Sequence, residues 1–358
     1  HSFPTRRSSD LVNLNYTLSP HIMLMALNQG EISHIITSEK FLEKLEGKGF
    51  DFRDVMGERI VTLEQVSGSI KKSQKTKILL EALLTPKWWL KFRYFDYISM
   101  EDTATILFSS GSEGHPKGVE LTHRNLIANI KQVAALFQYG QNDVMLNSLP
   151  IFHSLGLTVT TLLPLCEGVP MASVADPTDS VAIGKMVARY NATILFATPT
   201  FLRLYTLNKK LDPLMFASLR MVVAGAEKLK PEIRKAFKEK FGIGLLEGYG
   251  AKETSPVVSC NMPNALDLDT MQVIVCNKEG TIGQPIPGTL IKIVDPNTLE
   301  CLGLNEDGLI LVGGAQVMKG YFNDPEKTKE AIVEIDGVRY YKTGDKGHID
   351  EDGFLSIV

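Results

Sequence analysis

The sequence has few of the features that mark disulfide-rich, disordered or membrane-spanning proteins. Four cysteines are scattered over 358 residues, without a Cys-x-x-Cys pair or a Cys/His cluster at zinc-binding spacing. This excludes a disulfide framework and a structural zinc site, and it favours reduced thiols in a cytoplasmic protein. The 29 glycines and 17 prolines are too few for a collagen-like or low-complexity chain.

A strong net charge and a long apolar run are missing too. The net charge of −3 gives no overall basic field for a nucleic acid, so we expect no nucleic-acid partner. Residues 1–11 lack the apolar core of a secretion signal. The longest apolar region, residues 149–175, is broken by a histidine, a glutamate and prolines, which is incompatible with a membrane span.

Strands and helices alternate along the middle of the chain, where 44% apolar residues overall allow a large core. Alternating apolar residues predict a strand over 103–109, followed by a glycine-rich loop and a helix capped by Thr122. Further strands are predicted over 192–196 and 220–224, and a helix over 231–241. This order is typical of an α/β fold with a mostly parallel sheet.

The two ends of the chain give weaker patterns. A short strand and a helix capped by a serine are predicted over 32–42, whereas residues 51–77 are polar and are expected to be irregular. Residues 78–84 form a short apolar helical run that ends at a proline. After residue 273, short strands separated by glycine, proline and Asp/Asn turns predict a β-rich part whose only helix lies around 325–333.

Residues 87–100 contain both tryptophans of the chain, interleaved with Lys87, Lys91 and Arg93. Such a composition suits the bilayer interface and also stacking on bases. The alternative is a surface segment whose rings pack on the domain while the basic stems cover apolar surface. Packing and contact with a membrane surface both stay open, and the near-neutral net charge argues against nucleic acid.

A phosphate-binding composition follows the strand 103–109. Glycines let backbone N–H groups approach phosphate oxygens closely, hydroxyls donate hydrogen bonds to them, and a lysine adds positive charge. The residues that we assign to this role are Ser109, Ser110, Gly111, Ser112, Gly114 and Lys117. The common NTPase loop is excluded because Pro116 precedes the lysine and Gly118 follows it. On composition alone, a plain surface turn is an equal alternative.

This loop and three later motifs together resemble the signatures of the ANL superfamily of adenylate-forming enzymes. The motifs are LPIFH at 149–153, GYGAKE at 248–253 and YKTGD at 341–345. Within the superfamily, they are most similar to acyl-[acyl carrier protein] synthetases, which occur as part of a bacterial bifunctional acyltransferase/acyl-acyl carrier protein synthetase. The resemblance begins at residue 13, and it implies a chain that is incomplete at both ends.

The resemblance implies the architecture of an adenylate-forming N-terminal core. Two α/β subdomains with largely parallel sheets are expected over 13–140, which is partial and carries the phosphate loop, and over 141–270. A small β-barrel-like subdomain is expected over 271–358, and the C-terminal lid of the superfamily is expected to be absent. Residues 1–12 match nothing in the superfamily and are interpreted as an artefact.

The resemblance also implies a reaction that uses ATP and Mg²⁺. A long-chain fatty-acid carboxylate attacks the α-phosphorus of ATP, pyrophosphate leaves, and the thiol of acyl carrier protein or CoA then displaces AMP. In this interpretation Lys117 and its loop hold the β- and γ-phosphates, Glu253 binds Mg²⁺, and Asp345 accepts hydrogen bonds from the ribose hydroxyls.

The remaining implied site residues surround the adenine and the acyl group. Gly225, Ala226, Glu227 and Tyr249 border the adenine, with the tyrosine ring stacked on it. His153 lines the pocket near the reacting carboxylate, although a histidine at the head of an apolar run is more usually a core residue. Taken singly, an aspartate in a turn, an exposed glutamate and a core tyrosine need no function.

Two positions depart from the superfamily pattern. Lys252 replaces a small hydroxyl residue that donates to the α-phosphate, and Glu113 replaces a threonine in the phosphate loop. A missing transition-state donor costs about 3 kcal/mol, but a lysine also brings positive charge to the same phosphate. Lys252 is therefore counted with Lys117 and Glu253 as a catalytic residue.

Two other functions stay open at this point. The chain could be a nucleotide-binding scaffold without catalysis, or a domain that adenylates amino acids. The expected location is cytoplasmic, with peripheral contact at the inner membrane as a further expectation.

Overall fold

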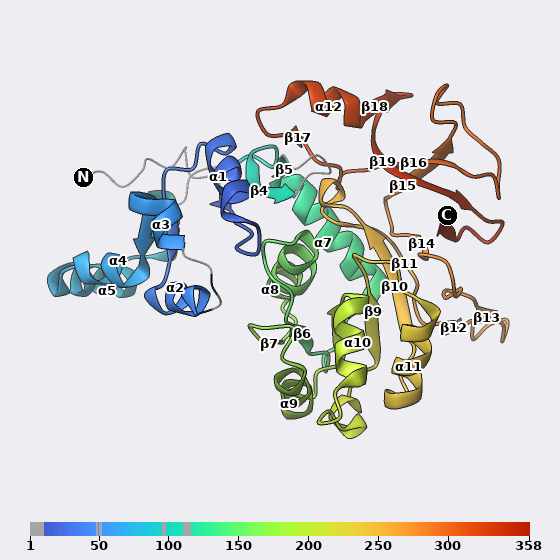
Figure 1. The fold of residues 1–358 in the computed structure, drawn as a ribbon, viewed down its shortest axis with the longest axis horizontal. Helices are drawn as coiled ribbons and strands as arrows, with labels where there is room; N and C mark the ends of the chain where they lie inside the picture. Colours follow the sequence, from blue (N-terminus) through green and yellow to red (C-terminus); the bar gives the residue numbers. More distant parts are fainter. Residues whose placement is uncertain (1–10, 48, 50–51, 95–97, 110–115) are drawn as a thin grey trace. The chain divides into compact units, whose positions relative to one another are not determined.

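The computed structural model describes residues 11–47, 49, 52–94, 98–109 and 116–358. The chain divides into two compact units (Figure 1). The first comprises His1–Asp102 and Phe108–Gly118, and the second comprises Thr103–Leu107 and Val119–Val358. Within the described ranges, no helix has the length and apolarity needed to cross a bilayer.

A parallel pair of short strands organises the first unit. β2 (Ile35–Thr37) runs beside β3 (Ile60–Thr62). Apolar side chains from the surrounding elements form its core, namely Met23, Leu27, Leu42, Leu45, Phe52 and Met56. The other elements of this part are β1 (Leu11–Val12), α1 (Pro20–Gln29), α2 (Glu39–Glu46), α3 (Phe52–Met56), η1 (Gly57–Arg59) and α4 (Leu63–Ser69).

The first unit holds more regular structure than its sequence predicts. The predicted strand and serine-capped helix are confirmed, because β2 leads into α2 and Ser38 Oγ accepts a hydrogen bond from the Phe41 amide at 3.2 Å. The expectation of an irregular stretch over 51–77 is wrong, since it contains α3, β3, α4 and the start of α5 (Lys72–Leu84). Thr62 and Gln65 form reciprocal capping bonds of 3.3 and 3.0 Å that start α4.

Two consecutive helices follow in the first unit. α5 (Lys72–Leu84) begins six residues before the predicted apolar run, because lysine and glutamine are also good helix formers. α6 (Lys87–Tyr94) then starts directly after Pro86, which fits the preference of proline for the entry to a helix. None of the residues described in α5 and α6 is buried.

The second unit is built around a seven-stranded sheet with the order β14-β11-β10-β9-β8-β6-β7. Its five strands from β7 to β10 are parallel, as the alternating sequence predicts. β11 pairs antiparallel with β10, and β14 pairs antiparallel with β11. The strands are β6 (Met145–Asn147), β7 (Met171–Ser173), β8 (Ile194–Ala197), β9 (Met221–Ala224), β10 (Leu245–Gly250), β11 (Val257–Cys260) and β14 (Gln284–Pro285).

Helices cover both faces of the parallel strands, so alternate residues of each strand enter different cores. In β9, Val222 and Ala224 pack with residues of α9, α10 and α11, whereas Met221 and Val223 pack with residues of α7 and α8. α10 and α11 contact each other side by side (Figure 1). The helical elements are α7 (His123–Phe137), η2 (Leu155–Leu162), α8 (Leu163–Glu167), α9 (Ser180–Tyr190), α10 (Pro199–Leu207), η3 (Pro213–Phe216) and α11 (Pro231–Phe241).

The predicted β-rich part is confirmed as an antiparallel sheet with the order β15-β16-β19-β18 and with β20 beside β19. Its strands are β15 (Leu290–Val294), β16 (Gly308–Gly313), β18 (Ile332–Ile335), β19 (Val338–Ile349) and β20 (Leu355–Ile357). Separately, β17 (Gly320–Tyr321) pairs with β5 (Lys117–Thr122), which neighbours β4 (Thr103–Ser109). The remaining elements are η4 (Lys252–Thr254), β12 (Ala265–Leu266), β13 (Val273–Ile274) and α12 (Pro325–Ala331).

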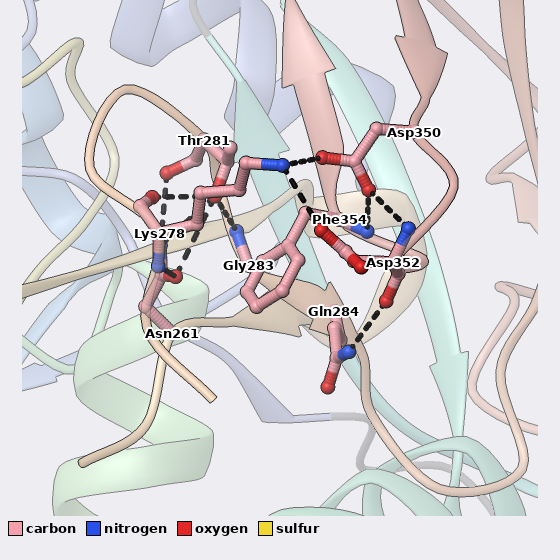
Figure 2. Close-up of polar contacts among 8 residues, drawn as sticks. All are labelled: Asn261, Lys278, Thr281, Gly283, Gln284, Asp350, Asp352 and Phe354. Carbon is pink, nitrogen blue, oxygen red and sulfur yellow. Dashed lines mark hydrogen bonds and ion pairs between the residues drawn. The ribbon is translucent and has the colours of Figure 1, made fainter. Parts of the chain in front are cut away.

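A polar junction fixes the β-rich sheet against the edge of the parallel sheet (Figure 2). The Lys278 ammonium contacts Asp350 at 2.6 Å and Asp352 at 3.3 Å, in the turn between β19 and β20. The Lys278 amide donates to Asn261 Oδ1 at 2.9 Å, and Asn261 in turn donates its own amide to the Glu247 carbonyl of β10 at 2.8 Å. This chain of contacts links the turn between β19 and β20 to β10.

Candidate functional site

Most predicted site residues of the second unit follow the carboxyl ends of parallel strands. β6 leads into residues 148–153, β9 leads into residues 225–227, and β10 carries Tyr249 and leads into residues 252–253. In open α/β sheets, ligands bind at this edge, outside the carboxyl ends of the strands. The topology therefore brings together segments that are about a hundred residues apart in the chain.

The loop after β9 is held in a defined conformation. The Gly225 amide donates to the Ala197 carbonyl at 3.2 Å, and Ala226 adopts a left-handed φ of +67°. One carboxylate oxygen of Glu227 accepts hydrogen bonds from the Thr200 hydroxyl at 2.6 Å and from its amide at 3.2 Å. Thr200 lies in the first turn of α10, where the helix dipole favours a negative charge. No local sequence pattern predicted this contact.

A largely buried ion pair contacts the end of the same loop. Arg234 Nη2 lies 2.8 Å from Glu247 Oε2, and its Nη1 donates to the Leu245 carbonyl at 2.7 Å. Glu247 Oε1 accepts the Leu229 amide at 3.4 Å. Burial raises the pKa of Glu247 although Arg234 opposes that shift. Sequence reasoning did not identify this pair, which ties the end of the 225–229 loop and α11 to β10.

Tyr249 and Asp345 are in direct contact. The tyrosine hydroxyl of β10 donates a hydrogen bond to Asp345 Oδ2 of β19 across 96 residues of sequence. The Asp345 amide donates to Thr343 Oγ1 at 3.0 Å, and that hydroxyl donates to the Ile310 carbonyl at 2.9 Å. Burial, followed by the neighbouring Asp345, raises the pKa of Tyr249 far above its usual range. The tyrosine therefore stays protonated and acts as a donor.

Glu253 is in contact with one tyrosine and interacts electrostatically with a second. The Tyr321 hydroxyl donates to Glu253 Oε1 at 2.9 Å, and the Glu253 carbonyl accepts the Met318 amide at 2.8 Å. Tyr341 of β19 is in hydrogen-bonding contact with Tyr321. Burial, with the charge of Glu253 as the next cause, raises the pKa of both tyrosines. Tyr321 was not predicted, because a Gly-Tyr pair in a two-residue strand carries no chemical signal by itself.

His153 and Lys252 influence each other electrostatically. Burial by neighbouring groups, and then the positive charge of Lys252, lower the pKa of His153. Burial also lowers the pKa of Lys252, against the opposing effect of Glu253. The His153 ring lies 4.6 Å from the Phe152 ring, between centroids. Both effects favour the neutral form of His153 at neutral pH. The residue as a whole remains accessible to solvent, while neighbouring groups partly cover its ring.

The predicted phosphate loop is described only at its two ends. Ser109 is the last residue of β4, and its hydroxyl donates to the Lys117 carbonyl, at the start of β5, at 3.5 Å. The intervening predicted residues, Ser110, Gly111, Ser112 and Gly114, lie outside the described residues. The role of this loop in phosphate binding stays a prediction.

A model of the family described as "AMP-binding enzyme" matches residues 9–322, which is most of the chain. The chain belongs to the AMP-binding enzyme family.

Curated proteins of similar sequence are ligases that act on carboxylic acids and CoA. The chain is 35% identical over 262 residues to a probable 4-coumarate–CoA ligase of Dictyostelium discoideum, across 72% of this chain and 45% of that protein. It is 34% identical over 261 residues to a long-chain-fatty-acid–CoA ligase of Salmonella typhimurium, across 72% of this chain and 44% of that protein. The chain thus spans about half the length of these relatives.

Solved structures of the same fold cover nearly all of the chain. ATP-bound MatB from Rhodopseudomonas palustris superposes with a TM-score of 0.73 at 27% identity, over 96% of this chain and 62% of that one. The O-succinylbenzoate coenzyme A synthetase of Bacillus subtilis, in complex with ATP and a magnesium ion, gives a TM-score of 0.74 at 22% identity, over 97% and 63%. The second likeness concerns the fold alone.

Glu253 is the one metal ligand predicted from the sequence, and it would have to share Mg²⁺ with a bound nucleotide. Among the described residues, no group of three or more His, Cys, Asp or Glu side chains is placed to hold a metal ion alone. Mg²⁺ is commonly bound by one or two carboxylates together with substrate phosphates and water. Glu253, with Oε1 fixed by Tyr321, supplies one such oriented carboxylate.

Proposed function

We propose that the chain carries the adenylate-forming site of an acid–thiol ligase. The substrate is a long-chain fatty acid, which ATP converts to an acyl-adenylate before transfer to the thiol of acyl carrier protein or CoA. The contact between Tyr249 and Asp345 is the observation that carries the proposal, because it joins the two motifs assigned to adenine and ribose. Membership of the AMP-binding enzyme family supports the same chemistry.

The adenosine is proposed to lie between the loop after β9 and the Tyr249–Asp345 pair. The tyrosine ring offers a stacking surface for adenine, beside Gly225, Ala226 and Glu227. Asp345 keeps acceptor capacity for ribose hydroxyls, because each carboxylate oxygen accepts more than one hydrogen bond and Tyr249 occupies one position only.

Within the second unit, the phosphates are proposed to extend towards Glu253 and Lys252. Mg²⁺ bound by Glu253 would neutralise charge on the phosphates as pyrophosphate leaves. Lys252 is partly exposed to solvent, and burial lowers the pKa of its ammonium group. A partly desolvated ammonium group interacts more strongly with an anion than one in bulk water does. Its charge would therefore replace the hydrogen bond of the small hydroxyl residue that most superfamily members have there.

The acyl group is proposed to enter beside His153 and η2. η2 follows the His153 segment directly and carries three leucines and a valine beside its threonines. Leu155 lies close to Gly225, with its Cδ2 3.7 Å from the position that a Cβ of Gly225 would occupy. A neutral His153 offers a hydrogen bond without a second charge next to the reacting carboxylate. The named fatty-acid relative supports an aliphatic substrate, and the motif resemblance favours acyl carrier protein as the thiol acceptor.

ATP–pyrophosphate exchange tests the proposal with the gene product that carries this sequence. Palmitate should stimulate exchange, and Glu253→Gln should remove the stimulation, whereas the distant Glu239→Gln, on α11, should keep it. ATP binding without exchange would favour the nucleotide-binding scaffold. Exchange driven by amino acids and not by palmitate would favour an amino-acid-adenylating domain, and exchange driven by 4-coumarate alone would change the substrate class.

A further inference from the structure

The α5–α6 hairpin, residues 71–94, exposes an unusual number of large apolar side chains. Leu83 and Leu84 of α5 are 71% and 79% exposed, and Trp88 and Phe92 of α6 are 70% and 74% exposed. Ile78, Leu79, Leu80, Trp89 and Tyr94 are exposed as well. Soluble proteins seldom gather so much apolar surface on one element unless a partner covers it.

The aromatic residues of α6 form a connected group. Trp88 and Phe92 are four residues apart and Trp89 is three residues before Phe92, so the three share one side of the helix. The Trp88 and Trp89 rings lie 5.8 Å apart, and the Trp89 and Phe92 rings lie 5.9 Å apart, between centroids. Tryptophan side chains of this kind favour the interface between lipid headgroups and acyl chains.

The same hairpin is strongly basic, in contrast to the whole chain with its net charge of −3. It contains seven basic residues, which are Lys71, Lys72, Lys75, Lys77, Lys87, Lys91 and Arg93, and one acidic residue, Glu81. Glu81 lies 3.4 Å from Arg93, and this ion pair joins α5 to α6. The lysines therefore set the charge that the hairpin presents to an approaching surface.

We infer that the α5–α6 hairpin binds an anionic phospholipid surface. Its leucines, tryptophans and phenylalanine enter the headgroup region, and its lysines contact lipid phosphates. Charge complementarity selects this partner, because each basic residue close to an anionic bilayer adds to the attraction. A second copy of the hairpin would bring like charges together in a symmetric contact, and a nucleic acid would leave the aliphatic residues of α5 exposed.

Tryptophan fluorescence gives a direct test with the whole protein. Trp88 and Trp89 are the only two tryptophans, so their emission reports on α6 alone. Vesicles of mixed phosphatidylglycerol and phosphatidylcholine should shift the emission to shorter wavelength and carry the protein in a flotation assay. Vesicles of phosphatidylcholine alone should have a weaker effect, and high salt should reduce binding to the anionic vesicles.

Charge and apolar variants separate the two contributions. Lys87→Glu/Lys91→Glu should weaken binding to the anionic vesicles about 25-fold or more, since each basic residue at such a surface contributes about fivefold. The matched control Lys185→Glu/Lys235→Glu, at exposed positions of α9 and α11, should bind as the unchanged protein does. Leu83→Ser/Phe92→Ser should lose binding, whereas the equally exposed control Leu214→Ser/Leu268→Ser should keep it.

Three results would overturn the inference. One is unchanged emission with the anionic vesicles. Another is a response to a single-stranded oligonucleotide that exceeds the response to vesicles, which would identify a nucleic-acid surface. The third is emission that already depends on protein concentration without lipid, which would show that a second copy covers the hairpin. None of these outcomes depends on ligase activity, so the test is independent of the proposed function.

Discussion

The hydroxyl of Tyr321 donates a hydrogen bond to Oε1 of Glu253 at 2.9 Å, although 68 residues separate the two in sequence. Tyr321 belongs to the short strand β17, and Glu253 lies just beyond the carboxyl end of β10. The contact orients the carboxylate that we propose for Mg²⁺. It also gives β17 a positioning role that its length of two residues would not suggest.

Tyr321→Phe should raise the Mg²⁺ concentration needed for half-maximal palmitate-dependent exchange by about tenfold. A hydrogen bond to a charged group contributes about 1.5–3 kcal/mol, and its loss lets the carboxylate rotate. Tyr340 is also buried and lies in β19. Tyr340→Phe is therefore the matched control and should leave the Mg²⁺ requirement unchanged. An unchanged requirement in Tyr321→Phe would remove the positioning role.

Tyr249→Phe should weaken ATP binding severalfold, and Tyr249→Ala should weaken it further. The phenylalanine keeps the ring for stacking on adenine but loses the hydroxyl that holds Asp345. In a double-mutant cycle with Asp345→Asn, the two losses should be non-additive, because the side chains act through one shared contact. Additive losses, measured by calorimetric titration, would show that the hydroxyl and the carboxylate act separately.

The pKa of His153, followed by NMR, should lie below the ordinary value of about 6.5. Lys252→Met should raise it only part of the way, because burial is the larger cause and remains in the variant. Lys185→Met, at an exposed position of α9, is the control and should leave it unchanged. A pKa at or above the ordinary value would show that neither burial nor the charge of Lys252 acts on the His153 ring.

The same lowered pKa predicts the direction of a stability change. Between the folded-state pKa and about 6.5, the unfolded chain binds more protons at this histidine than the folded chain does. The free energy of unfolding therefore decreases as the pH falls through this window, because protonation of His153 favours the unfolded chain. Above the window, the histidine is neutral in both states and causes no such loss. His153→Gln should flatten the acid side of the stability curve, measured by urea unfolding at a series of pH values.

Gly156→Ala should destabilise the second unit by about 1–3 kcal/mol, as overpacking in a dense region does. A Cβ at this position in η2 would lie 2.1 Å from the Pro150 carbonyl oxygen, so backbone would have to move. At Gly244, an added Cβ meets nothing within 4 Å, and Gly244→Ala should be neutral by comparison. Equal free energies of unfolding for the two variants would show that the backbone at Pro150 and Gly156 is not closely packed.

The sequence predicted best those elements whose local signals agree with their packing. The helix 231–241 begins at a proline and ends before a glycine, and α11 has these bounds. Strand 103–109 was predicted from alternation and is β4. Residues 52–69 were harder, because their helices are only a few residues long and α4 has no buried residue. The capping pair Thr62 and Gln65 is the clearest local signal in this stretch.

The candidate site was predicted only as far as motifs mark it. Tyr249, Glu253 and Asp345 were found through motif resemblance, and the fold brings the tyrosine and the aspartate into contact. Tyr321, Thr200 and the Arg234–Glu247 pair were missed, because their role comes from contacts between distant segments and not from any local pattern. Such contacts become visible only once the strand order is known.

Binding of Mg²⁺-ATP to Asp345→Ala, measured by calorimetric titration on the gene product that carries this sequence, tests the nucleotide site most directly. Loss of a carboxylate that accepts ribose hydroxyls should weaken binding about 10- to 100-fold, since hydrogen bonds to charged groups contribute about 1.5–3 kcal/mol. Asp307→Ala, which removes only the exposed partner of His348, should bind as the unchanged protein does. Equal ATP affinity in all three proteins would contradict the account.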